Sequence, residues 1–306
     1  MDRFAELKAF CLVAASGGFS PAARQLGLAT SSVTRLVDAL EERLGVVLLN
    51  RSTRSVTLTD SGRTYHEEAR RVLEQLDAAD EAVATGNGEL KGMLRVAAPV
   101  SFAALHITPI LPELRARHPR LSLDLRLSDE AASLVDESID VAIRIGRVEP
   151  EARLVARRLS GHRRLLCASP GYLLDRGTPI LPADLVHHDV LQFGNHRVWH
   201  MRRLEAGGET VFEEEVAVDA VLQANSGELL RQAAIAGLGI AMLAHWLVRD
   251  DVAAGHLAPV LQGYQANPGP MDVALYALYQ PNRRGSHKIR AFVDLLEDHL
   301  RRTGLS

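Results

Sequence analysis

The stretch that decides the fold is Ser20–Leu44, SPAARQLGLATSSVTRLVDALEERL. It predicts two short helices joined by a tight turn. We expect Ser20 to cap the first helix and Pro21 to take its first position, because a serine side chain accepts an amide hydrogen bond there and proline has no amide to satisfy. Gly27 is then expected to end this helix in a left-handed conformation.

The second predicted helix runs from about Thr30 to Leu44 and has two unlike faces. Apolar residues at helical spacing form the face expected to be buried; they are Val33, Leu36, Val37, Leu40 and Leu44. The other face carries short hydroxyl side chains and charged ones, namely Ser31, Ser32, Thr34, Arg35 and Asp38. Such a face, supported by a second helix, suits the major groove of DNA, although an ordinary helical hairpin explains the same pattern.

The segments on either side extend this helix pair. Asp2–Ser16 predicts an amphipathic helix that packs beneath it. After the second helix, an apolar run and the alternating Val56–Leu58 predict two short strands with a polar tip that carries Arg51 and Arg54. A β-wing of this kind brings both arginines near backbone phosphate or a minor groove, while a solvated surface turn is the alternative. We place the winged helix-turn-helix at residues 1–58.

Residues 59–88 predict a linker helix with a heptad seam. Its apolar or small positions recur at alternating spacings of four and three residues; they are Tyr65, Ala69, Val72, Leu76, Ala79 and Val83. The opposite face is highly charged, so we favour a two-stranded coiled coil between two copies over a lone amphipathic helix. Gly86–Gly88 follows as a flexible joint and a domain boundary.

Composition limits the class of protein. The chain has 306 residues and a net charge of −3, so it is long enough for two or three domains but is not basic overall. Positive charge is local and modest, with five arginines against three carboxylates between Ser20 and Leu58. Cys11 and Cys167 lack metal or redox spacing and predict buried free thiols. Neither a targeting segment nor a bilayer-spanning apolar run is present, so we expect a cytoplasmic protein.

Residues 89–306 alternate short β-runs with helical stretches, which predicts an α/β domain. The family resemblance given below implies that this domain has two lobes, and we then expect the chain to cross between them near Gly161–Arg164 and again near Tyr264–Pro270. We place lobe I at about 92–161 and 266–306, and lobe II at about 162–265. A ligand in such a domain binds where strands end and helices begin.

Small polar residues follow three of the predicted strands and indicate an effector site. The candidate residues are Pro99, Val100, Ser101, Phe102, Ser128, Asp129, Arg144, Phe193, Asn225 and Ser226. Free amides at helix starts favour an anionic ligand, and Arg144 is a candidate partner for a carboxylate. The alternatives are helix capping for the serines and Asn225, a surface salt bridge for Arg144, and core packing for Phe193.

Residues 1–62 resemble the DNA-binding domain of LysR-type transcriptional regulators. The residues that carry the resemblance are Phe10, Gly17–Ser20, Ala22–Leu26, Val33–Arg35, Leu40–Glu41, Leu44–Gly45, Leu48, Arg51, Arg54 and Leu58–Gly62. Those similar to the family's effector-binding domain are Arg95–Val96, Ala98–Phe102, Asp140–Gly146 and Ala236–Ala241. The resemblance implies a winged helix-turn-helix, a coiled-coil linker helix, and a two-lobed α/β effector domain of periplasmic-binding-protein type 2, assembled as a homodimer or homotetramer.

The sequence departs from this family at Ala29, where a serine usually caps the recognition helix. We expect Thr30 to take that role one residue later. The residues expected to contact DNA are Ser20, Thr30, Ser31, Ser32, Thr34, Arg35, Arg51 and Arg54.

The sequence therefore predicts a ligand-responsive, sequence-specific DNA-binding transcriptional regulator. Its expected partners are double-stranded DNA, a small and anionic effector, and further copies of itself; RNA polymerase is another candidate, and no membrane is expected. The alternatives are a solute-binding protein or an enzyme on a periplasmic-binding-protein-like scaffold. An export signal and a convergent set of acid, base or nucleophile are both missing, so we expect no enzymatic activity, and neither a metal nor a cofactor.

Overall fold

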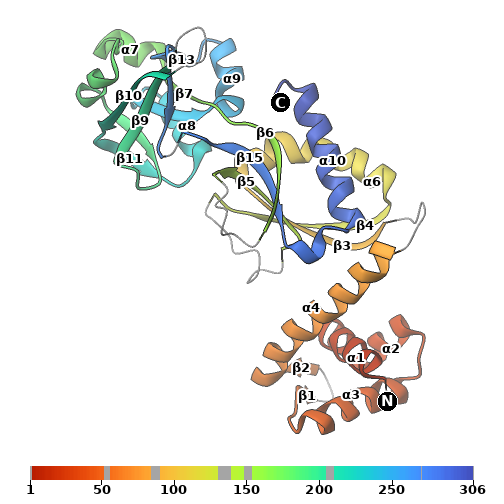
Figure 1. Ribbon diagram of the computed structural model, residues 1–306. Coiled ribbons are helices and arrows are strands. Elements are labelled where there is room, and N and C mark those ends of the chain that lie inside the picture. Colours follow the sequence, from red (N-terminus) through yellow and green to blue (C-terminus); the bar gives the residue numbers. More distant parts are fainter. Residues whose placement is uncertain are drawn as a thin grey trace. The chain divides into compact units, whose positions relative to one another are not determined.

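The computed structural model describes residues 2–51, 56–83, 90–129, 139–147, 154–204, 210–269 and 271–305, without the side chains of 74, 75, 77–83, 204 and 210–212. The chain divides into two compact units, Met1–Gly88 and Glu89–Ser306 (Figure 1). Three predicted features lie outside the described residues. They are Arg54 at the wing tip, the joint at Gly86–Gly88, and a helix that the sequence pattern predicts over Asp129–Glu137, of which Asp129 alone is described.

The described part of the N-terminal unit is a winged helix-turn-helix followed by a long helix. Its elements are α1 (Arg3–Ser16), α2 (Phe19–Leu26), α3 (Thr30–Leu44), β1 (Leu49–Arg51), β2 (Val56–Leu58) and α4 (Asp60–Val83). The predicted apolar stripe of α3 is confirmed, because Val33, Val37 and Leu40 are fully buried against α1 and α2. The two wing strands pair antiparallel, with Leu49 opposite Leu58.

The first helix of the pair starts earlier than the sequence predicts. It begins at Phe19 rather than after Ser20, because Gly18 takes the extended N-cap conformation, with φ −178° and ψ 157°. Pro21 is then the third helical residue, where the amide of a helix still has no intrahelical acceptor. Gly27 ends the helix in the left-handed conformation, with φ 66°, as expected. The prediction that Ser20 caps this helix is wrong.

The start of α3 also differs from expectation. Ala29 occupies the N-cap position, and no side chain there accepts an amide hydrogen bond. Thr30 is the first helical residue, and its carbonyl oxygen accepts a hydrogen bond from Oγ1 of Thr34 at 3.0 Å. Thr30 therefore does not replace the missing cap, and the free amides of the first turn of α3 are left to another partner.

The predicted seam of α4 has two parts, one packed within the N-terminal unit and one exposed. The Tyr65 ring lies 5.8 Å from the Phe10 ring of α1, and Ala69 is buried with only 3% of its surface exposed. Val72 and Leu76, farther along the same face, are 43% and 38% exposed. Tyr65 packs within its own unit, so the part of the seam left for a second copy begins at Val72; Ala79 and Val83 have side chains outside the described set.

Lobe I of the C-terminal unit is a five-stranded sheet covered by helices. Its described elements are β3 (Lys91–Ala98), α5 (Val100–Phe102), the π-helical turn η1 (Ala103–Ile107), the 3-10 turn η2 (Thr108–Ile110), α6 (Leu111–Arg117), β4 (Arg120–Leu127), β5 (Val141–Gly146), β6 (Val155–Gly161), β15 (Ala274–Tyr279), η4 (Pro281–Arg283) and α10 (His287–Arg302). The strand order is β4-β3-β5-β15-β6, with β3 parallel to β4 and β5, and β15 antiparallel to both of its neighbours.

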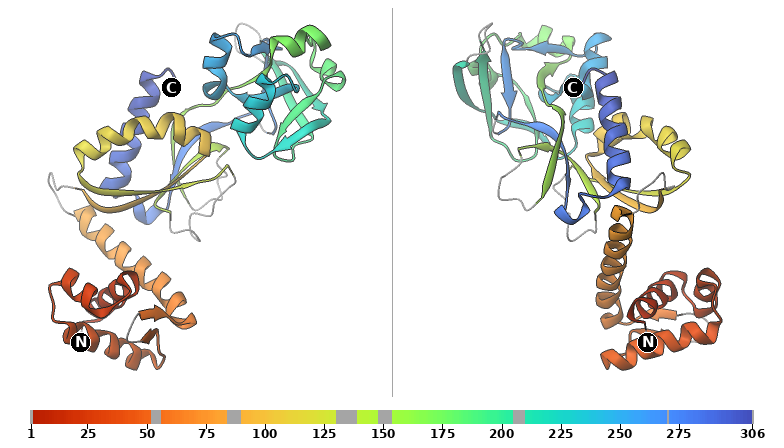
Figure 2. Two further views of the ribbon diagram at one scale, coloured as in Figure 1. Left: turned by 180° about the vertical axis from the view of Figure 1, so that it is seen from behind. Right: turned by 45° about the vertical axis from the view of Figure 1, so that its right-hand side comes forward.

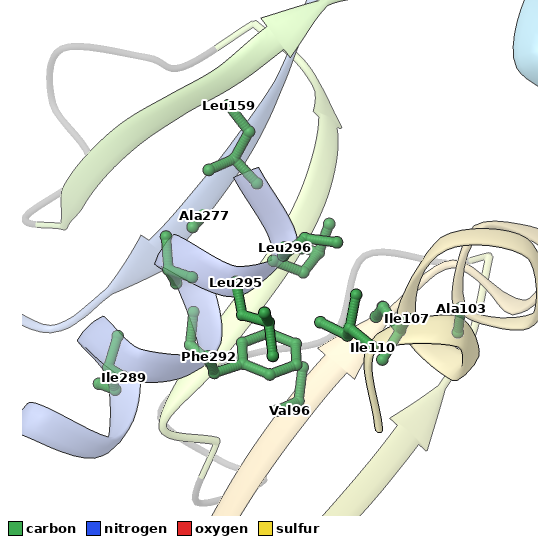
Figure 3. Close-up of a cluster of buried hydrophobic side chains, with 14 of the residues drawn as sticks. Val96, Ala103, Ile107, Ile110, Leu159, Ala277, Ile289, Phe292, Leu295 and Leu296 are labelled. Atoms are coloured by element: carbon green, nitrogen blue, oxygen red, sulfur yellow. The ribbon is translucent and has the colours of Figure 1, made fainter. Parts of the chain in front are cut away.

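The core of lobe I lies between this sheet and two helical segments. Figure 2 shows from two sides that α10 and the helical run from α5 to α6 lie beside each other. Phe292 and Leu296 of α10 meet Ile107, Ile110 and Val96 in one buried cluster (Figure 3). The C-terminal helix thus returns to the first strand of the unit and completes this lobe.

Lobe II contains the middle of the chain. Its described elements are β7 (Arg164–Ala168), α7 (Pro170–Arg176), the 3-10 helix η3 (Pro182–His187), β8 (Val190–Phe193), β9 (Val198–Leu204), β10 (Thr210–Ala217), β11 (Ala220–Ala224), α8 (Gly227–Ile235), β12 (Ile240–Ala244), α9 (His245–Ala253), β13 (Ala258–Val260) and β14 (Tyr264–Asn267). One sheet has the order β11-β8-β12-β7-β13, and a smaller sheet has the order β10-β9-β14.

The two crossings between the lobes join β6 to β7 and β14 to β15. Because β14 pairs with β9, lobe II continues to Asn267 rather than ending near residue 265. Cys167 is buried and Cys11 is only half-buried, and neither forms a disulfide. Among the helices that the structure describes, none combines the length and the apolar character needed to cross a membrane.

Candidate functional site

The outer face of α3 presents the side chains that the sequence assigns to DNA. Thr30, Ser31 and Arg35 are exposed, while Ser32 and Thr34 are half-buried. Nη2 of Arg35 lies 3.5 Å from Oγ of Ser32, which is a long contact. This face therefore offers hydroxyls and one weakly held guanidinium to a partner.

Arg51 connects the wing to α3 and does not project from the wing tip. Its guanidinium lies 2.6 Å from Asp38 Oδ1 and 2.5 Å from Glu41 Oε2, and its Cζ is 5.1 Å from the centre of the Phe19 ring. Oε1 of Glu41 accepts hydrogen bonds from the amides of residues 48 and 49, at 2.7 and 3.0 Å. Glu41, which sequence reasoning did not select, thus orients the wing against the recognition helix.

Both lobes of the C-terminal unit line one cavity of about 170 Å³. Half of the predicted effector residues line it, namely Pro99, Ser101, Asp129, Arg144 and Phe193. Phe102 does not, because it is buried in the core of lobe I, and Val100 is exposed beside a neighbouring groove. Ser128, Asn225 and Ser226 are also outside the lining of this cavity.

Helix capping explains some of the small polar residues but not Ser101. Oγ of Ser226 accepts a hydrogen bond from the amide of Leu229 at 3.3 Å and so caps α8. Oδ1 of Asp129 accepts one from the amide of Val100 at 2.9 Å, at the start of α5. Ser101 lies inside α5, where its hydroxyl is not needed as a cap, and it lines the cavity.

Several lining residues were not predicted from the sequence. The ones that matter most for chemistry are His162, Arg164, Trp199, Met242 and Trp246. His162 and Arg164 come from the first crossing between the lobes, and both tryptophans of the chain are in the lining. The predicted crossing at Gly161–Arg164 was the available signal for the first two, because a crossing borders the space between two lobes.

Arg164 and His162 differ in charge at neutral pH. Burial lowers the pKa of Arg164 to about 10, which leaves the guanidinium protonated. Burial, followed by the charge of Arg164, lowers the pKa of His162 to about 3, so the imidazole is neutral. Nη1 of Arg164 donates a hydrogen bond to Oδ1 of Asn267, while Nε2 of His162 is buried and has no hydrogen-bond partner among the described residues.

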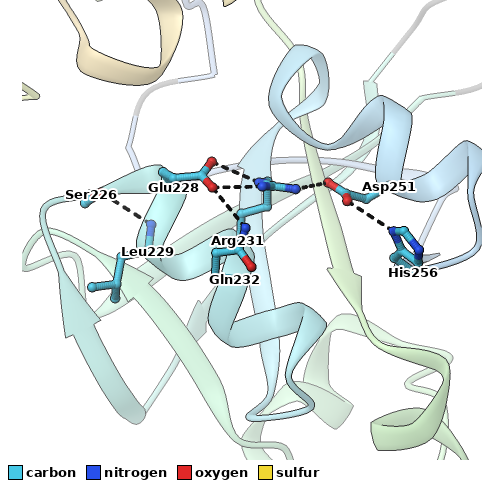
Figure 4. A network of polar contacts seen from close by, with 7 residues as sticks. All are labelled: Ser226, Glu228, Leu229, Arg231, Gln232, Asp251 and His256. Carbon is cyan, nitrogen blue, oxygen red and sulfur yellow. Dashed lines mark hydrogen bonds and ion pairs between the residues drawn. The ribbon is translucent and has the colours of Figure 1, made fainter. Parts of the chain in front are cut away.

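An aromatic cluster connects α9 of lobe II with lobe I on the other side of Trp246. The indole packs edge-on against Phe102 and His106, with ring centres 5.5 Å apart in each pair, and His106 lies 5.8 Å from His299 of α10. Beneath α9, Arg231 of α8 forms ion pairs with Glu228 at 2.8 Å and with Asp251 at 2.5 Å (Figure 4). These contacts hold α8 and α9 together and fix the helix that carries Trp246.

His106 makes the C-terminal unit sensitive to acid. Its side chain is 4% exposed without a described partner for either ring nitrogen, and burial lowers its pKa from about 6.5 to about 4. Below pH 6.5 the unfolded chain therefore binds more protons than the folded one, so stability falls as the pH drops from 6.5 towards 4. We expect His106→Phe, which keeps the aromatic contacts, to lose less stability between pH 7 and pH 5 than the wild type in urea unfolding. Equal losses in both proteins would contradict this.

Two known domain families match nearly the whole chain. Residues 4–63 match the bacterial regulatory helix-turn-helix protein, lysR family, and residues 87–301 match the LysR substrate binding domain. The chain belongs to the LysR family. It is thus a ligand-responsive DNA-binding transcriptional regulator, and the alternatives of a solute-binding protein and an enzyme are not favoured.

The alignments with relatives of this LysR-family chain cover more than nine-tenths of each protein described here. It is 34% identical over 299 residues to the transcriptional regulator CrgA of Neisseria meningitidis, covering 96% of each chain. It is 32% identical over 301 residues to the regulator DmlR of Escherichia coli, covering 96% of this chain and 93% of that one. The solved structure of CrgA, at 33% identity, aligns over 96% of this chain and 98% of its own with a TM-score of 0.59.

Proposed function

We propose that this LysR-family regulator binds DNA through α3 and the wing, and that a small anionic effector in the interlobe cavity controls how it does so. The observation that carries this proposal is the protonated, largely buried Arg164 in a cavity lined by both lobes. A buried cation is costly unless it is paired, and an anionic ligand supplies a pair. Closure of the lobes on that ligand would shift the arrangement of subunits and so the grip on DNA.

Pairing of two copies is part of the proposal. Val72 and Leu76 are apolar and exposed on one face of α4, which supports a coiled-coil contact from Val72 onward. Two copies would place their α3 helices in successive major grooves about 34 Å apart, or at a multiple of that spacing. We further propose that the regulator acts in the cytoplasm, catalyses no reaction and contacts RNA polymerase at promoters. A dimer or a tetramer satisfies these contacts equally.

The proposed function is tested by recovering the genomic DNA that the protein binds in cells and sequencing it. We expect a recurring two-fold-symmetric site near genes of small-acid metabolism, and gel shifts on that site that respond to organic acids. Recovered DNA without a recurring sequence would contradict the DNA-binding half of the proposal. If a recurring site is found but no organic acid changes the binding to it, the effector half is contradicted.

Ser101→Ala separates the two halves. Because the Ser101 hydroxyl lines the cavity without capping α5, we expect the variant to bind the recovered site normally and to respond to the active acid at least several-fold more weakly. The matched control is Ser122→Ala, which changes an exposed serine on β4 and is expected to respond to the acid like the wild type. A normal response from Ser101→Ala would remove the hydroxyl from the effector site.

A further inference from the structure

The face of α3 that is proposed to read DNA also carries two carboxylates. Four exposed residues follow one another at spacings of three or four on the side opposite buried Val37; they are Ser31, Arg35, Asp38 and Glu42. When α3 enters a groove, a carboxylate on this side comes close to the phosphates of the duplex, and like charges repel. The carboxyl half of α3 therefore needs a counter-charge.

Arg51 supplies that charge. Its Nη1 lies 2.6 Å from Oδ1 of Asp38, and its Nη2 lies 2.5 Å from Oε2 of Glu41, so the planar fork binds two carboxylates at once. The two carboxylates differ in exposure, because 52% of the Asp38 side chain is exposed but only 13% of the Glu41 side chain. Asp38 is therefore the partner that faces solvent and, in a complex, DNA.

An aromatic ring occupies the face of the same guanidinium. Cζ of Arg51 lies 5.1 Å from the centre of the ring of Phe19, the first residue of α2, within the range of a cation–π contact. To reach a phosphate, the guanidinium would have to leave two carboxylates and this ring. A phosphate contact would then replace existing interactions instead of adding one, and it would leave Asp38 without its counter-charge beside the DNA.

The start of the wing is attached to α3 without the help of Arg51. Oε1 of Glu41 accepts hydrogen bonds from the amides of residues 48 and 49, and these bonds involve no atom of Arg51. What Arg51 adds to this attachment is mainly charge. The loss of that charge should follow the behaviour of exposed electrostatic interactions, which are strong at low salt and screened at high salt.

The local charge is small enough for one neutralised carboxylate to matter. Between Ser20 and Leu58 five arginines face three carboxylates, and Asp38 and Glu41 are two of these three. Removal of Arg51 would halve the net charge of this stretch, from +2 to +1. The carboxylates released from their partner would lie on and beside the base-reading side of α3.

We propose that Arg51 contacts no phosphate and instead neutralises Asp38, so that the carboxyl half of α3 can approach DNA of any sequence. The inference rests on the proposed function, because it assigns a role within the same DNA-binding surface. It separates two arginines by task. Arg35 is the candidate for reading bases, whereas Arg51 removes a repulsion that would keep this surface away from the duplex.

A double-mutant cycle on the full-length protein tests this role. Binding of a labelled duplex of arbitrary sequence is measured by fluorescence anisotropy, at low and at high salt, for the wild type, Arg51→Gln, Asp38→Asn and the double variant. We expect Arg51→Gln to bind about tenfold more weakly than the wild type at low salt, and this loss to shrink as salt is added. In the Asp38→Asn background the same change should cost less than about threefold, because the repelling carboxylate is gone.

The control is Lys8→Ala, which removes an exposed cation from α1 and should bind like the wild type. A loss from Arg51→Gln that is equally large with and without Asp38 would overturn the inference. Such a loss would indicate a phosphate contact if salt reduces it, and a structural role if salt does not.

Asp38→Asn alone provides a second test that does not depend on the folding of Arg51→Gln. It should bind the duplex at least as tightly as the wild type, and weaker binding would overturn the inference, because the carboxylate would then contribute to binding. A wild type that binds neither this duplex nor genomic DNA would contradict the proposed function itself, and the role of Arg51 with it.

Discussion

Gly62→Ala is expected to destabilise the N-terminal unit by about 3 kcal/mol and to abolish DNA binding at moderate temperature. Gly62 is in the first turn of α4, where a Cβ would lie 2.0 Å from the carbonyl oxygen of Leu48 and 2.9 Å from its carbonyl carbon. Backbone atoms cannot rotate away as a side chain does, so either α4 or the start of the wing must move.

The surroundings of Gly62 make that movement costly. Oγ1 of Thr59 accepts a hydrogen bond from the Gly62 amide at 2.9 Å and donates to the carbonyl oxygen of Val47 at 2.9 Å, while the Thr59 amide donates to Leu48 at 2.9 Å. Moving α4 away breaks this set of bonds, which attaches the start of the wing to the beginning of α4.

The effect of Gly62→Ala is measured by urea unfolding of the full-length protein, with amide hydrogen exchange used to monitor the unfolding of each unit separately. The control is Gly171→Ala in helix α7, where a Cβ meets nothing within 4 Å and alanine favours the helix. We expect the control to be neutral or slightly stabilising and to leave DNA binding intact. If both variants unfold at the same urea concentration as the wild type, the close approach of α4 to the wing does not constrain this unit.

Local signals in the sequence predicted most of the elements, and the reasons for success and failure are physical. The bounds of α3 agree with expectation, because a regular apolar pattern and the stop at Gly45 define this helix locally. The strands β11, β13 and β14 have three to five residues each, and their existence depends on pairing partners far along the chain. The N-cap predictions for α2 and α3 failed because Gly18 and Ala29 act through their backbone conformation, which residue type does not reveal.

The cavity was predicted only in part for a similar reason. Residues that follow a strand, such as Ser101 and Asp129, could be recognised from their position alone. Arg164 lines the cavity because the chain crosses between the lobes there, and Trp246 lines it because α9 packs against lobe I. The spacing of residues in the sequence does not predict that these two side chains line the same cavity. The candidate site in α3 needed no such convergence, since its residues share one face of a single helix.

Arg35→Ala is expected to reduce affinity for the specific DNA site by about 30-fold or more. Arg35 is exposed on the outer face of α3, and a bidentate contact from arginine to guanine is worth about 1–3 kcal/mol. Each half-site of a dimer loses one such contact, so the effect is counted twice. Because the contact that Arg35 loses among the described residues is the long one to Ser32, the melting temperature should not change.

The matched control for Arg35→Ala is Lys8→Ala, which removes one exposed cation from α1 of the same unit. Gel shifts on the recovered site and on unrelated DNA, each at two salt concentrations, separate base recognition from attraction to phosphate. A base contact predicts that Arg35→Ala loses affinity for the specific site far more than for unrelated DNA, with Lys8→Ala close to the wild type on both. Equal losses on the two DNAs would mean that Arg35 binds phosphate, and the reading of sequence would then pass to the hydroxyls of Thr30, Ser31 and Ser32 at the uncapped start of α3.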